Sequence, residues 1–101
     1  MINKYPKTLL VIITEAVLEN ALVRDVRERG AQGWTVAEVH GGGSESVREG
    51  AWEADRTIEM KVICEPDVAD AIASHVLAAY ATNYSVVVYF SAVSVLRPDR
   101  Y

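Results

Sequence analysis

The chain has 101 residues, 50% of them hydrophobic, and a formal net charge of −4 at neutral pH. This length suits one domain, so we expect residues 1–101 to form a single unit. The acidic balance argues against a protein that binds nucleic acid through phosphate contacts, because that requires a basic surface. The apolar runs LLVII and VVVYF are too short to cross a bilayer, and MINKYPKT lacks the apolar core of a secretory signal. We therefore expect a cytoplasmic protein without direct membrane insertion.

The first predicted element is a strand over residues 8–13, because TLLVII is apolar at consecutive positions and rich in β-branched residues. Thr14 is expected to cap a helix over residues 15–29, with Glu15 near its positive end. Apolar residues at spacings of three and four support this helix. Gly30 is suited to end it, because glycine readily adopts the left-handed conformation.

The second half of the chain repeats this alternation of elements. Residues 33–40 alternate well enough to predict a strand, and residues 57–65 alternate apolar and charged side chains as a strand with one buried face does. Residues 66–83 follow as a helix that opens with proline, a residue favoured at the first helical position. Residues 85–96 form the last predicted strand. Between the middle strands lies an irregular loop over residues 41–56.

This order of elements predicts an α+β fold, a ferredoxin-like βαββαβ sandwich of the split βαβ kind. Right-handed crossovers place both helices on one face of the sheet. The first and last strands are apolar on both faces, so the uncovered face would expose a large apolar patch. We therefore expect this face to pack against copies of the same chain in a closed, cyclic oligomer.

The loop over residues 41–56 is unusually long, at sixteen residues, for a connection inside a small domain. It opens with GGGS, whose backbone N–H groups can approach an anion closely. It is not a P-loop, because no Gly-Lys-Ser/Thr follows, and no helix opens after it as in a dinucleotide-binding fingerprint. The alternative is a simple hairpin connection without a ligand.

Arginines supply a second indication of an anion site. Arg48 and Arg56 lie in the loop, and Arg97 and Arg100 follow the last strand. Arginine is suited to two-pronged contact with phosphate or carboxylate. These residues could form one site if oligomerisation brings the chain end of one subunit near the loop of another. Trp52 is either a partner anchor or a residue packed against the base of its own loop.

The sequence contains no clear catalytic constellation, and we do not expect an enzyme. Cys64 falls on the buried side of its strand, and His75 has no second ligand at metal-binding spacing, so no metal site is predicted. Glu15 with His40 is the one titratable pair that a cleft could hold. The alternative function is therefore a small ferredoxin-like oligomeric enzyme or metal-binding protein that uses Glu15 and His40.

The segment TEAVLENALVRDVRERGAQGWTVAEVHGGG resembles the signature region of PII and PII-like signal-transduction proteins. In these proteins a helix ends in Gly-x-x-Gly, an aromatic or apolar residue and Thr-Val follow, and a strand then runs into Gly-x-Gly. The matching residues are Gly30, Gly33, Trp34, Thr35, Val36, Gly41 and Gly43. The resemblance extends over nearly the whole chain, including the position of the long loop.

Within that family, GGGSESVREG is similar to PII-like regulators associated with bicarbonate transport. The resemblance implies a homotrimer that binds adenine nucleotides in the clefts between subunits. It also implies that residues 41–56, the T-loop, rearrange to engage or release a partner such as a bicarbonate transporter or another carbon-metabolism protein.

Carried over by position, the resemblance implies a set of nucleotide-binding residues. They are Thr35, Val36, Gly41, Gly42, Gly43, Ser44, Arg48, Tyr84, Ser85, Val86 and Arg97. Tyr84, Ser85, Val86 and Arg97 would come from the neighbouring subunit. Gly43, Ser44 and Arg48 would also hold bicarbonate as a co-ligand.

Two departures from the family pattern narrow the expected ligand. Glu45 stands after Ser44, where some relatives carry another arginine, and this weakens the case for a triphosphate. ATNYSVVV replaces the glycine- and lysine-rich turn of classical PII proteins, so ATP with magnesium and 2-oxoglutarate are not expected. We therefore expect a regulatory sensor of ADP or AMP.

Overall fold

The computed structural model describes residues 1–42 and 56–101. These residues form four strands, two α-helices and two short 3₁₀ helices. In chain order they are β1 (Tyr5–Glu15), η1 (Ala16–Leu18), α1 (Glu19–Glu28), β2 (Thr35–Val39), β3 (Thr57–Cys64), α3 (Pro66–Tyr80), β4 (Val86–Val95) and η2 (Pro98–Arg100). This is the predicted βαββαβ order.

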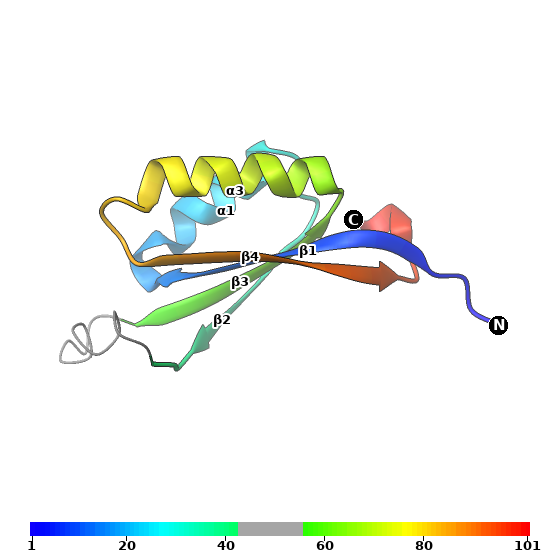
Figure 1. The fold of residues 1–101 in the computed structure, drawn as a ribbon, viewed down its shortest axis with the longest axis horizontal. Helices are drawn as coiled ribbons and strands as arrows, with labels where there is room; N and C mark the ends of the chain where they lie inside the picture. The colour runs from blue at the N-terminus through cyan, green and yellow to red at the C-terminus, as the bar shows by residue number, and fades with distance from the viewer. Residues whose placement is uncertain (43–55) are drawn as a thin grey trace.

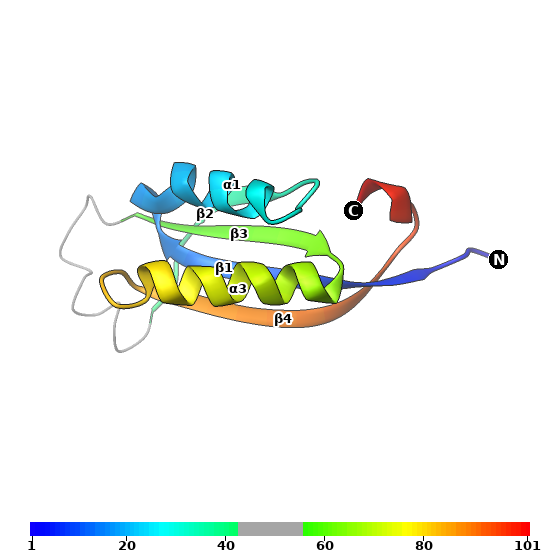
Figure 2. The same ribbon diagram turned by 90° about the horizontal axis from the view of Figure 1, so that it is seen from above.

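The four strands form one antiparallel sheet in the order β2-β3-β1-β4. Both α-helices lie on the same face of this sheet (Figures 1 and 2), which leaves the other face uncovered. The predicted ferredoxin-like α+β fold is therefore confirmed. Ile12 marks the register at the centre, where it pairs with Met60 on β3 and with Val88 on β4.

The core lies between the helices and the covered face of the sheet. Leu10 and Ile12 on β1 and Met60 on β3 are fully buried, as are Leu22 on α1 and Ile72 on α3. Spacings of three and four on the helices and of two on the strands bring these side chains into one layer. Cys64 joins this cluster, as predicted for a small core residue, and burial raises the pKa of its thiol.

The predicted start of the first helix is wrong. Thr14 and Glu15 are the last residues of β1, and α1 begins at Glu19 after the 3₁₀ turn η1. Thr14 does not cap a helix, because its hydroxyl donates instead to the Ser85 carbonyl at 2.7 Å. Glu15 likewise accepts a hydrogen bond from the Ser85 amide rather than facing a helix end. Pairing with the neighbouring strands thus outweighs the local capping signal.

The predicted end of that helix is correct. Gly30 has a φ of +107°, and the Ala31 amide reaches back to the Val26 carbonyl at 3.0 Å. A left-handed residue at this position lets the chain leave the helix while its last carbonyls stay hydrogen-bonded. β1 begins at Tyr5, earlier than predicted, because β4 is long enough to pair Val95 with it.

On the uncovered face of the sheet, only the half formed by β1 and β4 is apolar. Val11 on β1 points to this face because its neighbours Leu10 and Ile12 point into the core. Next to it on β4, Val87 and Tyr89 remain 52% and 46% exposed. The half formed by β2 and β3 carries charged side chains such as Lys61, which pairs with Val11 and is exposed. The apolar strip over β1 and β4, here called the open strip, is where we expected a second copy to pack.

Candidate functional site

The candidate residues lie at two opposite ends of the sheet (Figures 1 and 2). The loop end comprises residues 14–16, 39–42, 56–57 and 81–86, where β2 ends, β3 begins and α3 turns into β4. The pocket end comprises residues 32–33, residue 63 and residues 94–101, where β3 and β4 end. β4 joins the two ends and is ten residues long, which corresponds to about 30 Å.

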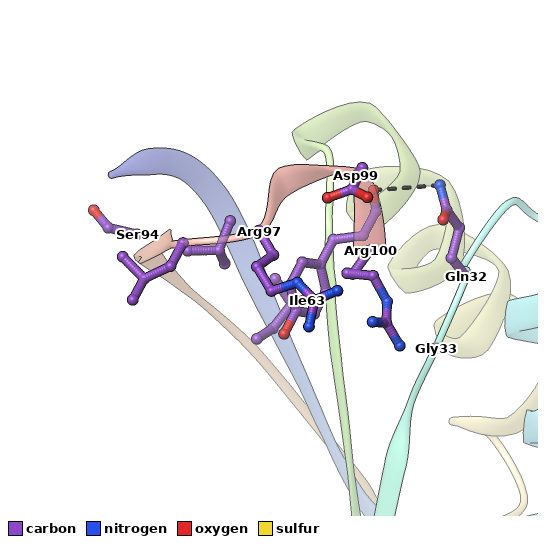
Figure 3. Close-up of a pocket in the computed structure, with 10 residues that line it drawn as sticks. Gln32, Gly33, Ile63, Ser94, Arg97, Asp99 and Arg100 are labelled. Carbon is purple, nitrogen blue, oxygen red and sulfur yellow. Dashed lines mark hydrogen bonds between the residues drawn. The ribbon is translucent and has the colours of Figure 1, made fainter. Parts of the chain in front are cut away.

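The pocket end holds an open hollow of about 740 Å³. It is formed by three separate segments: the connection before β2, the end of β3, and the end of β4 with the turn η2 that follows it. The lining residues are Gln32, Gly33, Ile63, Ser94, Val95, Leu96, Arg97, Asp99, Arg100 and Tyr101. Figure 3 shows Arg97 and Arg100 around this turn, together with the hydrogen bond of 3.4 Å from Gln32 Nε2 to the Tyr101 carbonyl.

The pocket carries two side chains of the kind that binds anions. Arg97 and Arg100 are both exposed, and their guanidinium groups offer paired donors to phosphate or carboxylate oxygens. Asp99 adds one negative charge to the same rim. Gly33 carries no side chain, and a methyl group there would meet no atom within 4 Å, so a ligand can approach the backbone.

The loop end is held together by hydrogen bonds between side chains and backbone. The Ser85 carbonyl accepts from the Thr14 hydroxyl at 2.7 Å, and the Ser85 amide donates to Glu15 Oε2 at 2.8 Å. The Tyr84 amide donates to the Tyr80 carbonyl at 2.9 Å, and the two tyrosine rings meet edge to face. These contacts fix the turn between α3 and β4.

A buried polar cluster supports this turn from behind. Asp25 is only 2% exposed and accepts hydrogen bonds from Arg24 and from the Tyr80 hydroxyl. His75 Nε2 lies 3.1 Å from Asp25 Oδ2, and Arg29 contacts the other ring nitrogen at 2.9 Å. Burial favours protonation, but the hydrogen bonds from Tyr80 and Arg24, together with the adjacent His75 ring, outweigh it and lower the pKa of Asp25. The cluster therefore ties α1 to the end of α3.

The structure places the predicted site residues in two groups. Thr35 and Val36 open β2 beside the pocket-lining Gly33, with Thr35 exposed and Val36 packed against the core. Arg97 lines the pocket. Gly41, Gly42, Tyr84, Ser85 and Val86 all belong to the loop end.

One protomer does not bring these two groups together. They also differ from the two sets that the resemblance implied, because Thr35 and Val36 lie at the same end as Arg97, whereas Gly41 and Gly42 lie at the end of residues 84–86. Tyr84, Ser85 and Val86 precede β4 or open it, whereas Arg97 follows it, so the strand separates them. Gly43, Ser44, Arg48 and Trp52 lie outside the described residues. The nucleotide and bicarbonate roles that the resemblance implies for these positions stay predictions.

The alternative pair of Glu15 and His40 is not assembled. Glu15 pairs with Thr57 on one side of β3, and Val39, the residue before His40, pairs with Thr57 on the other side. β3 thus lies between them, which places their backbones about 10 Å apart. The Glu15 carboxylate is directed instead to the Ser85 amide. Within residues 1–42 and 56–101, no three His, Cys, Asp or Glu side chains are grouped to hold a metal ion.

Sequence reasoning missed Gln32 and Ile63 in the pocket and the whole Asp25 cluster. The pocket residues come from separate segments and share no motif. Asp25 did carry a signal, because it lies on the same helix face as Leu22 and Val26, where an apolar residue is usual. A charged residue on that face indicates a buried partner, which here is Tyr80.

Comparison with known families agrees with this architecture. The model of the family described as nitrogen regulatory protein P-II matches residues 7–100. The chain belongs to this family. Within the described residues, no helix is long and apolar enough to span a membrane.

Solved structures of PII-like proteins share the fold over almost the full chain. A PII-like signaling protein from Thermus thermophilus is 32% identical, with 99% of both chains covered and a TM-score of 0.83. CPII from Thiomonas intermedia bound to ADP and bicarbonate is 23% identical, with 99% and 98% covered and a TM-score of 0.84. The same CPII bound to ADP, AMP and acetate is 20% identical, with 99% and 98% covered and a TM-score of 0.83.

Proposed function

We propose that this PII-family protein is a non-enzymatic, cytoplasmic regulator that binds ADP or AMP between neighbouring chains. The observation that carries the proposal is the division of the candidate residues between the two ends of the sheet. An arginine-lined pocket at one end and a glycine-rich strand exit at the other each offer half of an anion site. A second copy of the chain would complete the anion site by placing its loop end next to the pocket end of the first.

At the pocket end, the ligand would meet side-chain donors. Arg97 and Arg100 would contact phosphate oxygens, and Gly33 and Thr35 would lie beside the base or sugar. At the loop end, the ligand would meet backbone groups. Gly41, Gly42 and the turn over residues 84–86 would supply N–H donors from the adjacent chain, as backbone nests do in other phosphate sites.

The open strip supports the oligomer that this site requires. Val87 and Tyr89 are half exposed although they are large and apolar. Burying them against another chain removes this surface from water. In a homotrimer with cyclic symmetry each interface is heterologous, so two unlike surfaces of the chain meet there and the ring closes. The proposed surfaces are the pocket end of one chain and the loop end of the next.

Bicarbonate is the proposed co-ligand, and residues 41–56 are the proposed route to a partner. Gly43, Ser44 and Arg48 would hold the small anion next to the nucleotide. Ligand binding would favour one arrangement of the loop, since a ligand shifts an equilibrium by its differential affinity for the two states. The proposed partner is a membrane transporter, such as a bicarbonate transporter, or a carbon-metabolism protein.

A ligand panel tests this function directly. AMP, ADP, ATP and cyclic AMP, each with and without bicarbonate, are compared by thermal shift and by calorimetry. We expect ADP and AMP to stabilise the protein, and we expect Arg48→Ala to weaken their binding while the oligomer stays folded. Absence of adenylate binding at saturating ligand would refute the proposal, and unchanged affinity in Arg48→Ala would refute the role of that arginine.

A further inference from the structure

The last residues of β1 contact two other segments at once. Thr14 and Glu15 hold both backbone groups of Ser85, at 2.7 and 2.8 Å. The next amide, that of Ala16, donates to the Arg56 carbonyl at 2.8 Å, immediately before β3. Residues 14–16, here called the junction, therefore connect the turn between α3 and β4 to the residue on which residues 41–56 end.

These contacts replace ordinary strand pairing at the edge of the sheet. The ladder between β1 and β4 stops at the pair Thr14 and Val86, so Ser85 has no backbone partner across the strands. Two side chains of β1 satisfy it instead. Thr14 is only 2% exposed, which fixes its hydroxyl in place, whereas Ser85 itself is exposed. A buried group thus holds an exposed backbone segment.

We propose that Thr14 and Glu15 are positioning residues that preorganise the turn over residues 84–86 for the ligand. This inference rests on the proposed adenylate site, to which that turn would contribute. A turn that is already ordered binds more tightly, because the ligand's binding free energy is not spent on ordering it. The Ala16 contact attaches Arg56, the residue before β3, to the same junction.

The carboxylate of Glu15 permits a test that separates position from charge. A negative charge close to a phosphate weakens binding by repulsion, whereas an anchored turn strengthens it. Glu15→Gln removes the charge but keeps an acceptor oxygen for the Ser85 amide. Glu15→Ala removes both. Positioning predicts that only the alanine variant weakens binding, and repulsion predicts that both variants strengthen it.

The experiment compares Glu15→Ala, Glu15→Gln, Thr14→Val and Thr14→Ser with the wild-type protein. Thr14→Val keeps the shape and loses the hydroxyl, and Thr14→Ser restores the hydroxyl. Glu28→Ala is the matched control, because it removes one negative charge from an exposed position on α1. The readouts are ADP and AMP affinity by calorimetry, amide exchange of Ser85 by NMR, and the urea midpoint.

We expect Ser85 exchange to accelerate and ADP and AMP affinity to fall about tenfold in Glu15→Ala and Thr14→Val. The glutamine and serine variants should bind within about twofold of wild type, and Glu15→Ala should unfold at the same urea concentration as Glu28→Ala. If wild type binds adenylates and both disruptive variants bind equally well, the positioning role is refuted alone. If wild type binds no adenylate, the proposed function fails and this inference fails with it.

Discussion

The two ends of the sheet are built in opposite ways. At the loop end, Thr14, Glu15 and Tyr80 hold the exposed backbone through bonds of 2.7 to 2.9 Å. At the pocket end, two exposed arginines surround a hollow, and the hydrogen bond from Gln32 to Tyr101 is long, at 3.4 Å. One end offers ordered backbone groups and the other offers charge. We propose that a ligand held between neighbouring chains uses the backbone groups of one end and the two arginines of the other.

We expect the largest effect on stability at the buried Asp25 cluster, which supports the loop end of the sheet. Asp25→Ala leaves the Tyr80 hydroxyl and His75 without their buried acceptor, and each buried donor left unpaired costs about 1 to 3 kcal/mol. Urea unfolding monitored by circular dichroism measures this loss. Asp70→Ala, at an exposed position on α3, is the control and should cost less than about 0.5 kcal/mol. An equally small cost for Asp25→Ala would contradict the supporting role.

The same cluster predicts a dependence on pH. The pKa of Asp25 is lowered in the folded protein from its ordinary value of 3.8. The stabilisation that ionised Asp25 gives the fold is therefore fully present above about pH 4, its pKa in the unfolded chain. It is lost as the pH falls through the lower pKa of the folded state. The difference in unfolding free energy between wild type and Asp25→Asn should shrink below about pH 4. A difference that stays constant would show that the ionised carboxylate is not the stabilising form.

The next largest effect is expected on the oligomeric state, from substitutions on the open strip. Tyr89 and Phe90 are neighbours on β4 with nearly equal exposure, 46% and 47%, but they point to opposite faces of the sheet. Tyr89→Glu places a charge on the open strip and should dissociate the oligomer, as measured by light scattering after gel filtration. Phe90→Glu should leave a mass of three times 11.1 kDa. Dissociation by Phe90→Glu alone would place the interface on the other face.

A smaller effect, on ADP affinity, is expected from Arg97 at the pocket end. Arg97→Ala should weaken ADP affinity by about tenfold or more, since a charge-assisted hydrogen bond contributes about 1.5 to 3 kcal/mol. The ADP affinity of Arg97→Lys should lie between those of wild type and Arg97→Ala, because lysine keeps the charge but loses the two-pronged geometry. Lys4→Ala controls for net charge, and calorimetry provides the affinities. Because Arg97 is exposed, the urea midpoint should not move in either variant.

The smallest effect separates two glycines of the GAQG motif. Gly30 has a φ of +107°, so Gly30→Ala should destabilise the fold by about 1 kcal/mol. Gly33 has open space around it, so Gly33→Ala should leave stability unchanged and affect only ligand affinity. Urea unfolding and calorimetry on the same two samples distinguish these roles. Equal destabilisation by both substitutions would remove the argument that Gly33 serves the pocket.

The sequence predicted most of the fold because its periodicities are strong. The alternation from Ile58 to Cys64 and the four-residue spacing from Val68 to Tyr80 leave little choice of element. Thr14 was misassigned because a capping residue and a strand-ending residue have the same local signature. The deciding contact is with Ser85, 71 positions away. Gln32 and Ile63 escaped prediction for the same reason, since they meet Arg97 only after folding.

The most direct test of the central claim uses mixed oligomers of two binding-deficient chains. Arg97→Ala impairs the pocket end and Arg48→Ala impairs the loop, so each variant alone should bind ADP weakly. When the two are unfolded together and refolded, every ring that contains both chains has an interface where an intact pocket end faces an intact loop. We predict that calorimetry then recovers a class of sites with wild-type affinity for ADP. If mixing recovers none, the two arginines act within one chain, and the division of the site between neighbours is wrong.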